Sequence, residues 1–163
     1  MKVVVLADTH VRRGGARRLP DAVYAELEGA DAILHAGDLV APELLDELAG
    51  FAPVHAVLGN NDHELVGRLP ETERLELDGV AVALIHDSGN RTGRESRMAR
   101  RFPGSRIVVY GHSHIPDNHE GLEGQLLFNP GSATDRRGQP SHTYGVLDLQ
   151  SGTLRSSRVI VID

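Results

Sequence analysis

The chain has 163 residues, of which 40% are apolar and 25% charged, a composition typical of a soluble globular protein with one full hydrophobic core. It contains no cysteine, which excludes disulfides, thiolate metal sites and cysteine nucleophiles, so any metal must be held by His, Asp, Glu or Asn. The formal net charge of −6 argues against broad binding to a nucleic-acid backbone.

This length and composition predict a single domain over residues 1–163. No apolar run approaches the length of a membrane span, and an apolar segment begins at Lys2, which leaves no room for a signal peptide. We therefore expect a cytoplasmic protein without a membrane partner.

The N-terminal third alternates between two kinds of apolar pattern. Continuous apolar runs predict strands at 2–7, 31–36 and 54–58, while helical spacing predicts covering helices at 19–30 and 42–48. Strand, helix, strand, helix, strand is typical of a parallel βαβ arrangement, in which sites lie beyond the carboxyl ends of the strands.

Each of these three strands ends in residues suited to a polar site. The first stops at Asp8 and His10, the second runs through Gly37 into Asp38, and the third reaches Asn60 and Asn61 after Gly59. Because carboxyl ends of parallel strands meet at one edge of a sheet, we expect these side chains to converge.

The middle of the chain changes to a period of two. Residues 74–77 alternate apolar and charged, a turn follows, and the strand at 80–85 ends at His86. Thr92 and Glu95 have the spacing of a capping box, which predicts a short helix ended by the Pro-Gly pair that follows Phe102.

Residues 106–110 predict a further buried strand, followed by Gly111 and by two histidines one residue apart, His112 and His114. Alternation along an extended chain would send both imidazoles to one side, about 7 Å apart at Cα. One loop can therefore present two imidazoles to a small volume.

After His114 the pattern is all β. A strand at 125–128 enters the turn Asn129–Ser132, and residues 143–149 pair across Ser151-Gly152 with 154–162. We interpret these as antiparallel strands that complete a second sheet. The expected fold class is α/β, with two mixed β-sheets packed as a sandwich and flanked by helices.

Five loops, each after an apolar strand, thus offer metal-ligating side chains: Asp8 with His10, Asp38, Asn60, His86, and His112 with His114. Borderline ligands of this kind, with a carboxylate able to bridge, favour two cations of Mn, Fe, Zn or Ni over a lone Mg. Two metals about 3.5–4 Å apart lower the pKa of a bridging water to roughly neutral, which makes a nucleophile without serine or cysteine.

These motifs, in this order, resemble the calcineurin-like metallophosphoesterase superfamily. The short chain without a cap insertion and the turn Asn129–Ser132 resemble its small prokaryotic YfcE-type phosphodiesterase branch. The resemblance covers residues 3 to about 150 and implies a four-layer αββα fold.

The resemblance also implies roles for the residues. Two divalent metals, with Mn favoured, would be held by one group of Asp8, His10 and His114 and a second of Asn60, His86 and His112, with Asp38 bridging. A metal-bridging hydroxide would attack phosphorus in a small phosphate ester, for example a nucleotide. Small members of the family often self-associate, so a homo-oligomer is expected.

The chain departs from the family pattern at two positions. Many members carry a histidine after the metal-binding asparagine, where it assists the leaving group, and here that residue is Asn61. Asn61 cannot deliver a proton, and His63 is either its substitute or a solvated loop residue. We therefore place catalytic roles on Asp38, Asn60, Asn61 and His63. Asp87 stands where glycine is common, either to orient a ligand or to cap a turn.

Several features have two interpretations. The arginines spaced by three at 91, 94, 97 and 100 indicate a basic ridge for a phosphorylated substrate or, more simply, a solvated helix face. His35, His55, His119 and His142 are most simply structural or surface residues.

The alternative function is a protein-binding scaffold, as in the retromer subunit of this fold. A nuclease ranks low because the chain is acidic and poor in aromatics.

Overall fold

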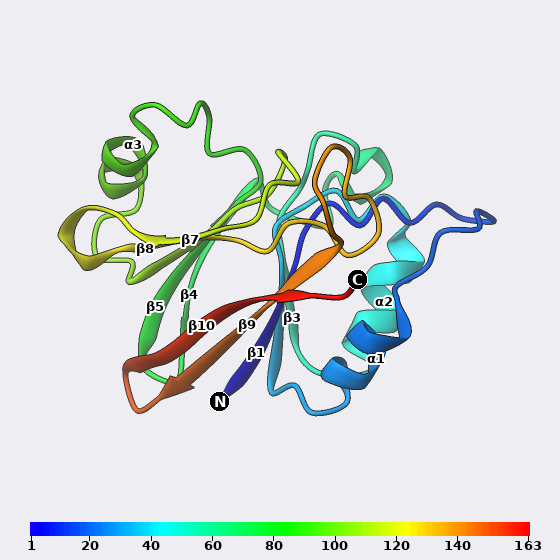
Figure 1. Ribbon diagram of the computed structural model, residues 1–163, viewed down its shortest axis with the longest axis horizontal. Helices are drawn as coiled ribbons and strands as arrows, with labels where there is room; N and C mark the ends of the chain where they lie inside the picture. The colour runs from blue at the N-terminus through cyan, green and yellow to red at the C-terminus, as the bar shows by residue number, and fades with distance from the viewer.

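The chain folds into two five-stranded β-sheets with helices outside them, and the computed structural model describes all residues from 1 to 163 (Figure 1). The first sheet has the strand order β10-β9-β1-β2-β3 and the second β4-β5-β6-β8-β7. This arrangement confirms the predicted α/β class with two mixed sheets.

The elements have the following bounds. The first sheet contains β1 (Lys2–Leu6), β2 (Ala32–His35), β3 (Val54–Ala56), β9 (Thr143–Gln150) and β10 (Thr153–Val161). The second contains β4 (Thr72–Leu77), β5 (Val80–Ile85), β6 (Ile107–Val109), β7 (Asp117–Glu120) and β8 (Leu126–Asn129). The helices are α1 (Asp21–Leu27), α2 (Pro42–Ala49) and α3 (Arg94–Arg101), with short 3₁₀ turns η1 (His63–Leu65) and η2 (Leu122–Gly124). None of the helices combines the length and the apolar character needed to span a bilayer.

Alternating side chains of β1 divide the core into layers. Val3 and Val5 belong to the cluster of 17 buried residues between the two sheets, whereas Val4 and Leu6 pack with α1 and α2 in a cluster of 16. A third cluster of seven residues joins α3 to the outer face of the second sheet. The order is therefore helix, sheet, sheet, helix.

The last two strands lie in the other sheet from the one expected. β9 pairs antiparallel with β1, with Val3 opposite Leu147, and β10 pairs with β9, so both belong to the first sheet. β8 instead runs parallel to β6 in the second sheet. The hairpin pattern was correct, but strand patterns carry no information about which sheet edge is free. Here β2 and β3 extend the first sheet on one side only, which leaves the other edge of β1 for β9.

The predicted capping box at the start of α3 is wrong. The residue before the helix is Gly93, with φ 75°, and no side chain caps the helix. Because the helix begins one residue later than Thr92 would require, Glu95 is out of register for the reciprocal bond. A glycine in the left-handed conformation makes the entry turn instead.

The two sheets come into close contact where Gly145 of β9 faces Phe128 of β8. A Cβ on Gly145 would overlap the Phe128 ring and lie 3.1 Å from Cβ of Val5. We expect Gly145→Ala to lower the free energy of unfolding by about 1–3 kcal/mol, as overpacking of a filled core does. Urea denaturation measures this change.

Gly138→Ala is the matched control, since a Cβ there meets nothing within 4 Å. It should shift stability by less than about 0.5 kcal/mol. Equal midpoints for the two variants would show that the contact between the sheets is loose.

Candidate metal centre

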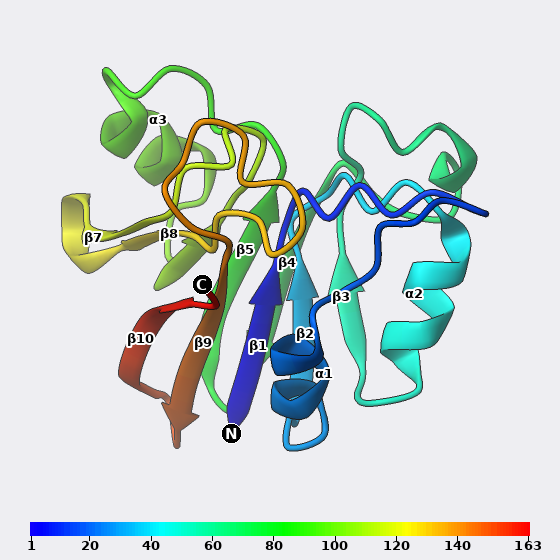
Figure 2. The ribbon, with the colours of Figure 1, turned by 45° about the vertical axis from the view of Figure 1, so that its right-hand side comes forward.

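The polar residues that follow the strands converge at one end of the sandwich. β1, β2 and β3 are parallel, so their carboxyl ends meet at one edge, and in Figure 2 these ends and the loops beyond them lie at the top. β5 and β6 of the second sheet also run parallel to each other. The loops that follow them reach the same end of the sandwich.

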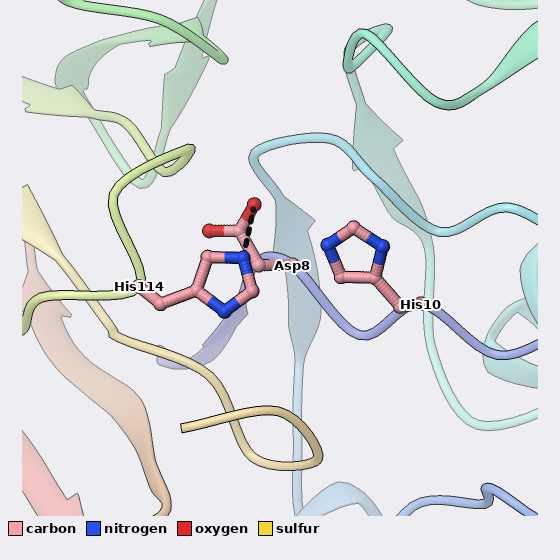
Figure 3. Close-up of side chains that lie close together, drawn as sticks. All are labelled: Asp8, His10 and His114. Atoms are coloured by element: carbon pink, nitrogen blue, oxygen red, sulfur yellow. Dashed lines mark ion pairs between the residues drawn. The ribbon is translucent and has the colours of Figure 1, made fainter. Parts of the chain in front are cut away.

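One group of side chains consists of Asp8, His10 and His114, which lie together in Figure 3. One ligand atom from each lies within 4.8 Å of the others. Nε2 of His114 is 3.6 Å from Oδ1 of Asp8, and the rings of His10 and His114 stack with centroids 5.2 Å apart. All three are largely withdrawn from water.

A second group lies beside the first. Nε2 of His86 is 3.0 Å from Oδ1 of Asn60, and Nδ1 of His112 is 3.1 Å from the same oxygen. Ligand atoms of Asp8, Asp38 and His86 also lie within 4.8 Å of one another. Asn60 and His112 are exposed, so this side of the centre opens to solvent.

Asp38 lies between the two groups. Its Oδ2 is 3.4 Å from Nε2 of His10 and 3.6 Å from Nε2 of His86. The structure thus brings together all seven predicted ligands, and it places Asp38 where one carboxylate reaches toward both sets.

The buried atoms of this cluster fit a cation. Both carboxylate oxygens of Asp8 and the Nε2 atoms of His10 and His114 are buried without a hydrogen-bond partner. Burial, with the nearby Asp38 charge, raises the pKa of Asp8 to about 8, and burial lowers the pKa of both histidines. Unpaired buried acceptors are costly, and a divalent cation would satisfy all four atoms together.

Backbone carbonyls orient two of the imidazoles. Nδ1 of His86 contacts the carbonyl of Ala36 at 2.7 Å, and Nδ1 of His114 contacts the carbonyl of Asp135. A carbonyl only accepts hydrogen bonds, so Nδ1 carries the proton and Nε2 keeps its lone pair toward the cluster.

The loops that carry these residues are not extended, which corrects the expected alternation of His112 and His114. Both have left-handed backbones, with φ 69° and 60°, as do Asp8 (53°), His10 (46°) and Asp38 (60°). As a result His112 joins the Asn60 group and His114 the Asp8 group. Such conformations cost on the order of 1–3 kcal/mol each and gather at functional sites.

The sequence profile of the calcineurin-like phosphoesterase superfamily domain matches residues 1–152. The chain belongs to the calcineurin-like phosphoesterase superfamily. A probable metallophosphoesterase of Methanothermobacter thermautotrophicus is 36% identical over 136 residues, which cover 82% of this chain and 78% of that protein.

Solved structures share the fold. Vps29 of Entamoeba histolytica complexed with zinc superposes with a TM-score of 0.79 at 25% identity, covering 100% of this chain and 99% of that one. An archaeal phosphodiesterase superposes with a TM-score of 0.74 at 22% identity, covering 99% and 100%. Members of this superfamily are phosphoesterases that use divalent metals, and the candidate ligands here include Asp8, His10, Asp38, His86 and His114.

The structure of this phosphoesterase shows the contacts of Asn61 and Asp87, the two residues that depart from the family pattern. Asn61 donates to Asp38 twice, from its backbone N–H to Oδ1 and from Nδ2 to Oδ2, each at 2.8 Å. Burial raises the pKa of Asp38, but these two bonds, together with the nearby His86 and His10, outweigh burial, so its pKa is lowered. Asp87 accepts from the N–H of Gly89 at 2.8 Å and lies 4.0 Å from Nε2 of His112.

Other predicted or considered residues lie apart from the cluster. His63 is exposed and makes no hydrogen bond or ion pair with the candidate ligands. His35 is buried against Thr9 at 3.0 Å, and burial lowers its pKa to about 3, so it is a neutral support. Of the four spaced arginines, Arg94 and Arg97 donate to backbone carbonyls of the preceding loop, so these two form neither a continuous basic ridge nor a fully solvated helix face.

The sequence interpretation missed Asp62. This buried carboxylate accepts from the backbone N–H groups of Asp38, Val40 and Gly59, each at 2.7 Å, and so ties the Asp38 loop to the Asn60 loop. Its place three residues after Gly59, within a polar loop, was the only signal.

We expect Asp62→Asn to lower the free energy of unfolding by about 2 kcal/mol, because hydrogen bonds to a charged acceptor are lost and the new amide N–H₂ faces backbone donors. Activity should fall with it, because the loop that carries Asp38 is released. Urea denaturation and steady-state rates measure both. Asp46→Asn, on the exposed face of α2, is the control. An unchanged midpoint with full activity would show that Asp62 does not hold this loop.

Proposed function

We propose that this phosphoesterase is a metal-dependent phosphodiesterase that hydrolyses small phosphate esters, nucleotides among them. The main observation that supports this proposal is the set of four buried ligand atoms without partners on Asp8, His10 and His114, which border Asp38. The likeness to an archaeal phosphodiesterase supports the diesterase preference.

In this proposal Asp8, His10 and His114 hold one cation, Asn60, His86 and His112 hold another, and Asp38 serves both. When bound, the cations would polarise phosphoryl oxygens and make water acidic enough to react near neutral pH. Manganese is the metal that we favour. Asn61 holds Asp38 in position, and carbonyls hold His86 and His114.

The leaving group meets no evident proton donor in this cluster. Asn61, which donates to Asp38 from its backbone N–H and from Nδ2, is an amide and cannot deliver a proton, and His63 lies outside the cluster. A leaving group must therefore depart without help from these two residues.

The expected result is a steep dependence of rate on the pKa of the leaving group across a series of aryl phosphodiesters. Asn61→His should flatten that dependence, raising the rate for the poorest leaving group about a hundredfold relative to the rate for para-nitrophenolate. His63→Ala should leave the slope unchanged. A flat dependence in the wild type, or a steeper one in His63→Ala, would identify a proton donor that this proposal omits.

The direct test is hydrolysis of bis(para-nitrophenyl) phosphate by protein stripped with EDTA and then supplied with Mn²⁺. Activity should be absent in EDTA and return with the metal. No hydrolysis with Mn²⁺, Fe²⁺, Zn²⁺, Ni²⁺ or Mg²⁺ would overturn the assignment.

A protein-binding scaffold is the second candidate, favoured by the fold shared with Vps29. A scaffold could bind metal yet turn over no ester. Tight metal binding combined with inactivity on both monoesters and diesters would therefore support the scaffold, and metal-dependent turnover would support the enzyme.

A further inference from the structure

A cavity of about 470 Å³ is lined by residues of α3 and β7 and of the loops before them. Figure 1 labels these two elements. The lining of the cavity includes Arg91, Arg94, Glu95, Ser113, Asp117 and His119. Ser113 stands between His112 and His114 in the chain, so the cavity and the metal centre share one loop. Its volume is in the range of roughly 300–1,000 Å³ that holds small ligands.

Both acidic groups in this lining contact protein neighbours. Asp117 accepts from the hydroxyl of Tyr110 and lies 2.7 Å from Nδ1 of His119, while Arg94 is 3.8 Å away. Oε1 of Glu95 is 3.2 Å from Nε2 of the same histidine. A neutral imidazole carries one N–H, so His119 can donate to only one of these two carboxylates, and Asp117 keeps Tyr110 and Arg94 as further neighbours.

The basic groups in this lining have N–H donors that bond to no protein group. Arg94 is anchored by bonds of 3.2 Å to the Tyr110 hydroxyl and to the carbonyl of Gly89, yet its Nε atom is buried without a partner. Arg91 is exposed, and its guanidinium makes no hydrogen bond or ion pair. One fixed cation and one free cation thus border the cavity, a combination that recognises an anion.

We propose that this cavity binds the second arm of a phosphodiester substrate, and that Arg91 contacts an additional phosphate carried on that arm. The substrate class is then a nucleotide-like ester with more than one phosphate. The assignment of the scissile phosphate rests on the proposed function, whereas anion binding in the cavity does not.

The test uses two chromogenic probes that differ by one phosphate. They are the para-nitrophenyl ester of thymidine 5′-phosphate and the same ester with a 3′-phosphate. The wild type should favour the phosphorylated probe in kcat/KM, and Arg91→Gln should lose about fivefold on that probe alone, the size expected of an exposed ion pair. Added salt should reduce the preference.

A binding measurement separates this proposal from the proposed function. Thymidine 3′,5′-bisphosphate, titrated calorimetrically into metal-free protein in EDTA, should bind about fivefold more weakly to Arg91→Gln. Arg100→Gln, which changes an exposed arginine of α3 outside the cavity, is the matched control and should bind the bisphosphate as the wild type does.

If neither probe is hydrolysed but Arg91→Gln still weakens the bisphosphate, the proposed function fails and the anion site stands. If Arg91→Gln affects both probes equally, or binds the bisphosphate as the wild type does, the proposal for the cavity is overturned.

Discussion

Asp38→Asn is expected to reduce hydrolysis of bis(para-nitrophenyl) phosphate by at least about a hundredfold, since even residues that only support a metal ligand are worth 10–100-fold. Asp38 is the carboxylate that lies 3.4 Å from His10 and 3.6 Å from His86, so it reaches both sets of candidate ligands. The amide keeps the size of the side chain but removes its charge.

Asp148→Asn is the control for this variant, because Asp148 is exposed on β9 and makes no side-chain bond. It should retain full activity. The rates are measured with Mn²⁺ in excess, and circular dichroism checks that Asp38→Asn is folded. Equal rates for Asp38→Asn and the wild type would remove Asp38 from the reaction.

The sequence predicted the location of the candidate site because apolar strands ended in polar residues five times. Parallel strands of one sheet place their carboxyl ends at one edge, so pattern alone was sufficient to bring Asp8 and Asp38 together. His86 follows β5 of the second sheet and reaches them because the two sheets pack face to face. Residue spacing alone did not assign the two histidines to different groups, because that depends on left-handed backbones at His112 and His114, and only the family resemblance supplied the assignment. Non-glycine residues adopt this conformation only when the surrounding structure imposes it.

The fold was predicted by class but not in its strand order. The hairpin of β9 and β10 was visible, yet its place beside β1 depends on long-range pairing between Val3 and Leu147. Asp62 was missed for a related reason. A buried aspartate that accepts three backbone N–H groups looks, in sequence, like any polar loop residue.

Divalent metal is expected to raise the melting temperature of this protein substantially. A ligand present at 100 times its Kd stabilises the folded state by about 2.7 kcal/mol, which corresponds to roughly 5–10 °C for a chain of this size. The structural reason is that four buried ligand atoms of Asp8, His10 and His114 lack any partner until a cation binds. Melting curves in EDTA and in Mn²⁺ measure the rise.

Asp8→Asn should lose most of that rise, because Asp8 belongs to both groups of closely spaced ligand atoms. The metal-free variant should melt no lower than the metal-free wild type, since it no longer buries a carboxylate whose two oxygens are unpaired. Asp148→Asn should keep the full rise. If Asp8→Asn is stabilised by Mn²⁺ as much as the wild type is, the metal binds elsewhere, and the buried atoms around Asp8 must be satisfied in another way.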